Sequence, residues 1–395
     1  MDGVRLVAIQ LDNWKSFGSV STRNVINLAP LTILVGPNAS GKSNALDALR
    51  FLQGAAFGHS FGDVLRGRSE GGREIWPGIR GGVVEASRSG QHDFALWTRW
   101  EGVLGPGSSE RVTHLLHVDT GGDVSAVKEL LYKGESPEDY LLSTHAPART
   151  FYSSLGHVPA LIDVGSTTAG AEATATAREV QSAMRRAIFL DIQPAKMHDY
   201  RPINGGQLGT SGENISPVLQ SLRQQPERLQ DIVDWLSELC APAVKEIAFD
   251  ETQLREVMMF LVEAGGAKIS ARSMSDGTLR FLGLVTALLT SEPGTLLVLE
   301  EPDAGLHPSR IHLLAELLER VTQGGRIQVL ATTHSPTLLA HLSEASLKDV
   351  VAFGRDADSG VTVCSRLADL EHFDELRESD HLERLISTGW MERAL

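Results

Sequence analysis

One eight-residue segment constrains this chain more than any other part of it: Gly36-Pro37-Asn38-Ala39-Ser40-Gly41-Lys42-Ser43. The segment matches the pattern GxxxxGKS/T, follows an apolar, strand-like stretch at 31–35 and leads into a helical pattern at about 42–52. In this context the backbone N–H groups of the loop surround phosphate groups, and the helix N-terminus faces their negative charge. We therefore expect Lys42 to reach the β- and γ-phosphates of a nucleotide, Ser43 to hold Mg²⁺, and Asn44 to extend the nucleotide-binding set.

A second motif is a mostly apolar strand at 295–299 that ends in Glu300, Glu301 and Pro302. Open α/β sheets place ligand chemistry at the carboxyl ends of their strands. Because side chains alternate along a strand, two adjacent acids cannot share one role. We assign Glu300, with Ser43, to the Mg²⁺ shell, and Glu301 to the base that polarises the attacking water. Together with the loop, this motif predicts an α/β P-loop NTPase in which Lys42 and Glu301 are catalytic.

Two further motifs narrow the class: Ser275-Asp276-Gly277 precedes an apolar helix, and His334 follows an apolar strand at 327–332. Alone, Ser-Asp-Gly is more often a turn or a helix cap, and a single His is more often structural. In this order the four motifs resemble those of ABC-type ATPases. The resemblance implies a mixed sheet with flanking helices and a catalytic role for His334. It also implies that Ser275 and Gly277 contact the ATP bound to a second copy, and therefore a homodimer around two ATP molecules.

The chain most resembles the RecF, SMC and OLD branch of the ABC ATPases. The segment Asn13-Trp14-Lys15-Ser16-Phe17 is similar to the branch's Asn-Phe-Arg-Ser-Phe, which implies that Lys15 contacts the nucleotide. After the acidic strand, the run from Glu301 to Pro308 ends in Leu-His-Pro, as in RecF and OLD proteins. No heptad repeat predicts the long coiled coil of an SMC protein, and the segment after His334 is too short for the nuclease domain of OLD proteins. The glutamine loop of the family is left open, with Gln193 as one candidate.

These motifs divide the chain into four expected parts. Residues 1–55 and 245–395 form the ATPase head, with strand-like segments after Ile247 leading to its signature helix. Residues 56–155 form an antiparallel β lobe, with short strands at 82–86, 94–100 and 112–118. Residues 156–244 form an inserted helical arm, in which the small-residue run at 165–177 is expected to be a mobile loop.

Composition limits where the protein acts and what it binds. No apolar run approaches the roughly 20 residues that a membrane helix needs. Cys240 and Cys364 stand far apart without a metal-binding pattern, which fits a reducing cytoplasm. A formal net charge of −14 argues against a surface that coats nucleic acid. A DNA-binding face stays a hypothesis, based on five arginines of the β lobe: Arg66, Arg68, Arg73, Arg80 and Arg88.

The sequence thus favours an ATP- and Mg²⁺-dependent ATPase that switches a homodimer between open and closed arrangements. The resemblance further suggests a role in prokaryotic DNA maintenance or anti-phage defence, through a separate effector such as a nuclease or toxin. Two alternatives remain: a RecF-like repair protein that binds duplex DNA directly, and a scaffold that holds ATP without hydrolysing it.

Overall fold

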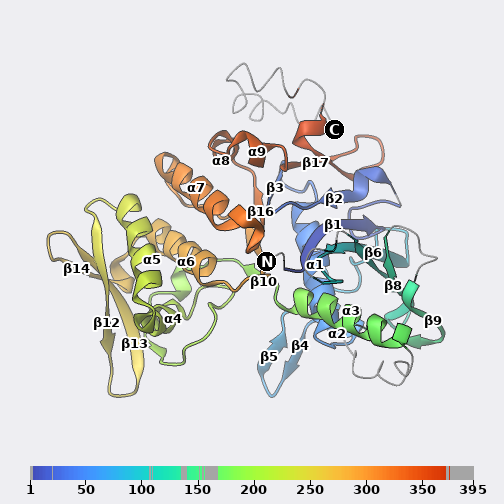
Figure 1. Ribbon diagram of the computed structural model, residues 1–395, viewed down its shortest axis with the longest axis horizontal. Coiled ribbons are helices and arrows are strands. Elements are labelled where there is room, and N and C mark those ends of the chain that lie inside the picture. The colour runs from blue at the N-terminus through green and yellow to red at the C-terminus, as the bar shows by residue number, and fades with distance from the viewer. Residues whose placement is uncertain are drawn as a thin grey trace.

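The protein has a central sheet with helices on both sides, flanked by a β-rich lobe and by an arm (Figure 1). The computed structural model describes residues 3–19, 21–105, 108, 110–134, 140–150, 152, 153, 155, 168–370 and 373. Among the described residues, no helix is long and apolar enough to cross a membrane.

The central sheet collects strands from distant parts of the sequence, in the order β10-β15-β16-β3-β17-β18. The first five strands of this order are parallel, and β18 pairs antiparallel with β17. In chain order the strands are β3 (Leu31–Val35), β10 (Ile188–Leu190), β15 (Leu296–Glu300), β16 (Gln328–Thr333), β17 (Val351–Arg355) and β18 (Thr362–Arg366). β3 and β16 are buried at every position, as expected for strands that are covered on both faces. The parallel strands therefore bring their carboxyl ends to one edge.

Alternate side chains of these strands enter two different hydrophobic cores. Ile33 and Leu299 belong to one core, with α6 (Asp276–Thr290) and α7 (Ile311–Thr322). Leu34 and Val298 belong to the other, with α1 (Lys42–Ala56) and α3 (Thr168–Arg185). The period of two along a strand produces this division, and each fully buried Leu or Val stabilises the fold by about 1.5–3 kcal/mol.

The β lobe is an antiparallel sheet of six strands, in the order β2-β1-β6-β7-β8-β9. In chain order these are β1 (Arg5–Asp12), β2 (Val25–Asn27), β6 (Asp93–Glu101), β7 (Val112–Asp119), β8 (Ser125–Lys133) and β9 (Tyr140–Thr150). The antiparallel lobe and its strands near 94–100 and 112–118 are confirmed, but 82–86 forms turns because Gly81 and Gly82 have positive φ angles. The first strand, β1, joins this lobe and not the central sheet.

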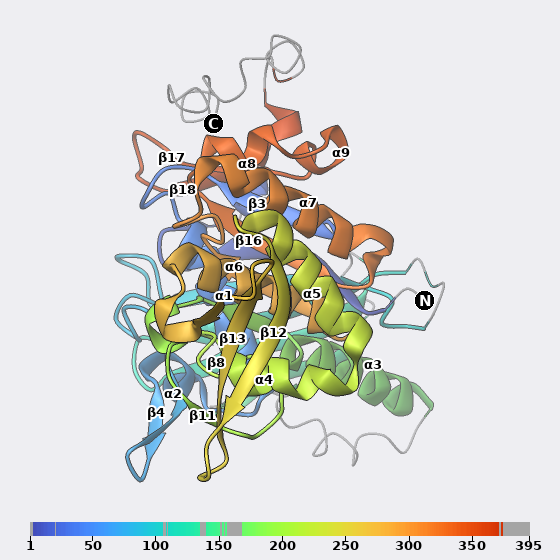
Figure 2. The ribbon, with the colours of Figure 1, turned by 90° about the vertical axis from the view of Figure 1, so that its left-hand side faces the viewer.

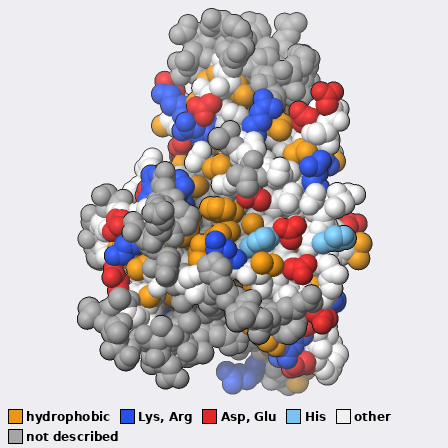
Figure 3. Space-filling model, turned by 90° about the vertical axis from the view of Figure 1, so that its right-hand side faces the viewer, with side chains coloured by type: hydrophobic (Ala, Val, Ile, Leu, Met, Phe, Trp, Pro, Cys, Tyr) orange, Lys and Arg blue, Asp and Glu red, His pale blue; other side chains and the backbone are white. Residues whose placement is uncertain are grey.

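A short helix and a hairpin connect the phosphate-loop helix to the lobe. Helix α2 (Phe61–Arg66) packs on α1, and β4 (Arg68–Glu70) pairs with β5 (Arg73–Trp76). On the face of the lobe in Figure 3, acidic, basic and His side chains surround hydrophobic ones. The described part of this face therefore carries no broad charge of one sign.

The arm combines helices with a sheet of its own (Figure 2). Helices α4 (Ile215–Ser221) and α5 (Pro226–Leu239) pack on β13 (Glu256–Glu263) and β12 (Val244–Glu251). Strand β13 pairs with β12 and also with β11 (Arg201–Pro202) and β14 (Lys268–Ser270). The strand-like segments after Ile247 thus belong to the arm. Conversely, β10 lies within the expected insertion but pairs with β15 in the central sheet.

The small-residue run at 165–177 corrects the expectation of a loop. From Thr168 onward it is the first half of α3, while 156–167 lie outside the described residues. Alanine has the highest helix propensity, and buried Ala177 and Val180 pack this helix into the core that contains α1. The short helices α8 (Pro336–Ala340) and α9 (Glu344–Leu347) complete the described fold before β17.

Candidate nucleotide-binding site

The predicted phosphate loop connects β3 to α1 at the carboxyl edge of the central sheet. A Cβ atom on Gly36 would lie 2.3 Å from the carbonyl oxygen of Phe353, and one on Gly41 would lie 2.3 Å from Thr362 Oγ1. Gly41 is also the N-cap of α1, with a φ of 109° and no capping hydrogen bond from a side chain. The first N–H groups of α1 thus have no side-chain cap, which suits them to an anion.

Lys42 is held inside this loop. Its Nζ donates hydrogen bonds to the carbonyl oxygens of Gly36 at 2.7 Å and Pro37 at 2.9 Å, and the residue is only 6% exposed. Burial lowers the pKa of Lys42, and the charge of Glu301 partly opposes that shift. The carbonyl groups of the loop therefore hold the ammonium group in place.

Ser43 and Glu300 meet although they lie far apart in the sequence. Ser43 Oγ donates a hydrogen bond of 2.9 Å to Glu300 Oε1, which joins the start of α1 to the end of β15. A hydroxyl and a carboxylate are the hard oxygen ligands that Mg²⁺ prefers. The pair therefore fits the predicted metal site.

Glu301 turns away from Glu300. Its φ of 47° is uncommon for a residue with a side chain, and such conformations cost about 1–3 kcal/mol. Its backbone N–H donates to Thr332 Oγ1 at 3.1 Å, and its Oε1 lies 3.4 Å from His334 Nδ1. The two adjacent acids thus contact different partners, Ser43 for one and His334 for the other.

Asp303 is a site residue that the sequence argument missed. It is 7% exposed, accepts a hydrogen bond of 2.9 Å from Thr333 Oγ1, and burial raises its pKa. Its Oδ1 has no hydrogen-bond partner among the described residues. Its position two residues after Glu301, in the same acidic run, was the available signal.

Arg80 is a second missed residue, because the sequence placed it only in the arginine cluster of the lobe. Its guanidinium lies 3.2 Å from Glu300 Oε1, 3.1 Å from the carbonyl oxygen of Ser43 and 3.3 Å from Asp47 Oδ2. Lys15 Nζ lies 2.6 Å from the same Asp47 oxygen, with both side chains almost fully buried. Asp47 on α1 therefore orients two cations beside the predicted metal ligands.

The other arginines of that cluster differ in their partners. Arg88 donates to the carbonyl oxygen of Ser359, while Arg68 pairs with Glu70 on the β4–β5 hairpin, whose strands also include Arg73. Arg80 and Arg88 both line a cavity of about 730 Å³ beside the start of α1, together with Lys15, Asn44 and Arg355. The lining of this cavity suits an anionic ligand, and a DNA-binding face of the five arginines stays a hypothesis.

The C-terminal strands support the loop from the other side. Thr362 Oγ1 donates to the carbonyl oxygen of Ser40 at 2.9 Å, and Arg355 Nε donates to that of Ala39 at 3.0 Å. Asn44 Nδ2 donates to Ser16 Oγ at 2.7 Å, which ties the segment around Lys15 to α1. These contacts hold the loop through hydrogen bonds that local sequence does not reveal.

Ser275 and Gly277 lie at the N-terminus of α6. Ser275 caps the helix by accepting a hydrogen bond of 3.1 Å from the N–H of Thr278, and it is exposed. In Figure 1, α6 lies on the arm side and α1 on the lobe side of the central sheet. Among the described residues, no hydrogen bond or ion pair joins Ser275 or Gly277 to the loop at 36–43. Gln193, left open above, follows β10 at the same sheet edge as Glu300 and donates to Asp191.

Comparison with known proteins places the chain in one family. The chain matches the family described as "AAA domain, putative AbiEii toxin, Type IV TA system" over residues 31–90 and 199–340, just over half of its length. The two segments contain the phosphate loop, Arg80, the signature residues, the acidic strand and His334. The unmatched interval between them holds most of the β lobe.

Individual relatives and structures are more distant. The chain is 22% identical over 382 residues to the Old nuclease of Escherichia phage P2, covering 93% of this chain and 62% of that protein. It is 39% identical over 62 residues to Structural maintenance of chromosomes protein 1 of Saccharomyces cerevisiae, covering 16% of this chain and 5% of that protein. It thus spans less than two thirds of either relative.

Among solved structures, an Smc head bound to the C-winged helix domain of ScpA has the same fold. Its TM-score is 0.50 at 16% identity, over 91% of this chain and 96% of that one. Motif order, family match and fold agree. The chain belongs to the matched AAA-domain family and is an ABC-type ATPase of the SMC and OLD branch.

Proposed function

We propose that this protein binds ATP with Mg²⁺, hydrolyses it, and uses bound ATP to close two copies of itself into a homodimer. The observation that carries the proposal is the meeting of two pairs at one sheet edge, Ser43 with Glu300 and Glu301 with His334. One pair supplies metal ligands, and the other supplies a carboxylate with a titratable partner. This arrangement is what phosphoryl transfer to water requires.

In the proposed reaction Lys42 exchanges its loop carbonyl partners for phosphate oxygens. Ser43 and Glu300 would hold Mg²⁺, which when bound neutralises charge on the phosphates. Glu301 would accept a hydrogen bond from the attacking water and orient it, and His334 would fix the position of that carboxylate. Lys15, Asn44 and Arg80 would line the path of the nucleotide beside α1, where the cavity is cationic.

The position of the α6 N-terminus supports the proposed dimer. Ser275 and Gly277 are proposed to donate to the phosphates of ATP bound in the second copy, where another helix N-terminus adds favourable charge. Ser275 is exposed and Gly277 is half-buried, and neither has a described contact with its own phosphate loop, which supports this trans arrangement. ATP would then stabilise the closed dimer only, and hydrolysis would release it.

We further propose that the switch acts in the cytoplasm, in prokaryotic DNA maintenance or anti-phage defence, and regulates a separate effector protein. Two similarities support this role: the matched family is named for a toxin of a type IV toxin–antitoxin system, and the phage P2 relative is a nuclease.

The deciding experiment is the mass of Glu301→Gln in solution, measured by light scattering with and without ATP and Mg²⁺. Removing the base should stop hydrolysis and leave an ATP-bound dimer, so the mass should double only with nucleotide. Lys42→Ala is the matched control and should stay monomeric. A monomer under every condition would contradict the two-headed arrangement, and unchanged hydrolysis by Glu301→Gln would contradict the assigned base.

A further inference from the structure

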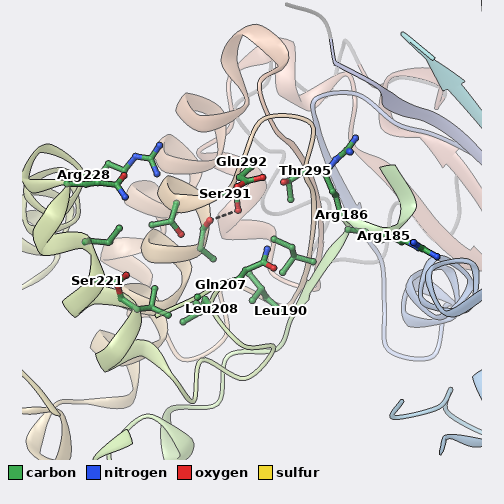
Figure 4. Close-up of a pocket in the computed structure, with 18 residues that line it drawn as sticks. Arg185, Arg186, Leu190, Gln207, Leu208, Ser221, Arg228, Ser291, Glu292 and Thr295 are labelled. Carbon is green, nitrogen blue, oxygen red and sulfur yellow. Dashed lines mark hydrogen bonds between the residues drawn. The ribbon is translucent and has the colours of Figure 1, made fainter. Parts of the chain in front are cut away.

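A second cavity, of about 530 Å³, lies where the arm meets the central sheet (Figure 4). Three parts of the chain enclose it: the end of α3 with β10, the arm from Gly206 to Arg228, and the end of α6 with the turn before β15. Its volume is within the range of small-molecule sites. The cavity therefore has the size of a ligand site and touches each major part of the molecule except the lobe.

This cavity lies at the opposite sheet edge from the predicted ATP site. Ile188 begins β10 and Thr295 directly precedes β15, and both line the cavity. Glu300, by contrast, ends β15. A ligand here would therefore be separate from the nucleotide.

The floor of the cavity is aliphatic. Leu190 and Leu208 lie side by side at its base in Figure 4, and Val218, Leu222 and Ala287 add further buried apolar surface. The hydroxyl groups of Thr290 and Ser291 do not offer hydrogens to the space, because each donates to a backbone carbonyl of α6. The floor therefore suits the apolar body of a ligand.

The rim carries polar groups without partners. The side chains of Gln207, Gln225, Arg228 and Glu292 line the cavity, and none has a hydrogen bond or ion pair within the described part of the chain. Arg186 donates to Ser182 Oγ, but its Nε is buried without a partner. Arg185 does not count toward the site, since Figure 4 shows it directed away and it donates to Ala56.

We propose that this cavity binds a small organic anion, with an apolar body on the aliphatic floor and one acidic group on Arg228. The lining contains the guanidinium groups of Arg186 and Arg228 and the carboxylate of Glu292, so its net charge is positive. Guanidinium pairs strongly with planar or tetrahedral anions, while Glu292 and the two amides can bind neutral polar groups of the ligand. The same chemistry covers a carboxylate, a sulfonate or a phosphate monoester.

Helix α6 connects this site to the predicted dimer contact. Its C-terminal end lines the cavity, and its N-terminal end carries Gly277, with Ser275 as the cap. A helix of 15 residues spans about 22 Å and moves as one body. A ligand that changes how the arm packs would therefore shift Ser275 and Gly277. This regulatory part of the inference depends on the proposed function, whereas binding itself does not.

The test uses the dye 8-anilinonaphthalene-1-sulfonate, an aromatic body with one anionic group, and its neutral analogue N-phenyl-1-naphthylamine. Fluorescence titration of the full chain should show one saturable site for the anionic dye. Arg228→Ala should weaken that dye about tenfold and leave the neutral analogue unchanged. Ser221→Trp, which places a large side chain in the space beside α4, should abolish binding of both.

Arg223→Ala is the matched control, because Arg223 is exposed on the turn before α5 and does not line the cavity. It should bind both dyes as the parent does, and circular dichroism should show that every variant is folded. Unchanged binding of the anionic dye to Arg228→Ala and Ser221→Trp would overturn the site. An equal loss of both dyes in Arg228→Ala would overturn its preference for anions.

Two further measurements separate this inference from the proposed function. Lys42→Ala should bind the anionic dye like the parent. A loss of dye binding in this variant would show that the cavity is not independent of the nucleotide site. In Glu301→Gln, saturating dye should change the ATP concentration needed for dimerisation at least twofold, and no change would overturn the link through α6. Dye binding without any ATP-dependent dimer would contradict the proposed function and leave the site standing.

Discussion

The two edges of the central sheet differ in how their polar groups are satisfied. At the carboxyl edge Lys42, Ser43, Asp47, Arg80 and Glu300 all have partners within the chain. At the opposite edge Arg228 and Glu292 line a cavity and have none among the described residues. The first edge is thus organised by its own contacts, whereas the second is open and would gain contacts only from a ligand.

The largest effect should come from the group at the centre of the organised edge. Lys42→Ala removes the buried cation of the loop, and ATP affinity should fall by roughly three orders of magnitude, about 4 kcal/mol. Isothermal titration calorimetry measures this loss, with exposed Lys348→Ala as the control. ATP affinity within tenfold of the parent would show that the paired edge is not the nucleotide site.

The second-largest effect should be the loss of stability when one ion pair at that edge is broken. Lys15→Met leaves the buried carboxylate of Asp47 with Arg80 alone, and removal of one partner from a buried pair costs about 3 kcal/mol. Denaturant unfolding measures the change. The double variant Lys15→Met with Asp47→Leu should recover most of the loss, and an additive loss would show that the pair does not act as a unit.

Two glycines with the same φ of 155° test the difference in packing between the edges. A Cβ on Gly36 would meet the carbonyl of Phe353, whereas one on Gly206, at the rim of the open cavity, would meet nothing within 4 Å. Since the two φ angles are equal and only Gly36 faces a close contact, Gly36→Ala should destabilise the protein by about 2 kcal/mol more than Gly206→Ala. Equal melting temperatures of the two variants would show that the two edges do not differ in packing.

The smallest effect concerns the pH dependence of stability. Burial raises the pKa of Asp303 above its usual 3.8, so the folded state binds the proton more tightly than the unfolded state. The contribution of this group to stability is therefore full at low pH and decreases as pH rises from 3.8 through the folded pKa. Asp303→Asn should flatten this part of the curve of unfolding free energy against pH. A curve identical to that of the parent would show that Asp303 does not titrate differently on folding.

The sequence predicted those site features that are contiguous in the chain. The phosphate loop and the acidic strand each occupy one strand end with its following turn, so their local pattern was sufficient for the P-loop fold and for placing Lys42 and Glu300 at one edge. The lobe strands near 94–100 and 112–118 were also predictable, because each one alternates over its own length. The assigned roles of these residues remain predictions.

Local pattern failed where packing decides the conformation or the partner. Residues 165–177 read as a loop because they are small and polar, yet α3 begins within them and is stabilised by the core around Ala177. Arg80 read as part of a basic face, yet it contacts Glu300, 220 positions away. Such a contact depends on which strands are neighbours, and no window of sequence contains that information.

The sequence by itself therefore determined the class of the protein, the phosphate loop and the acids that accompany it. Only the tertiary structure decided that Asp47 orients Lys15 and Arg80, that Thr362 holds Ser40, and that a second cavity opens beneath the arm. The physical reason is that motifs are formed by neighbours along the chain, while cavities and ion-pair networks are formed by strand order and packing between segments that the sequence keeps apart.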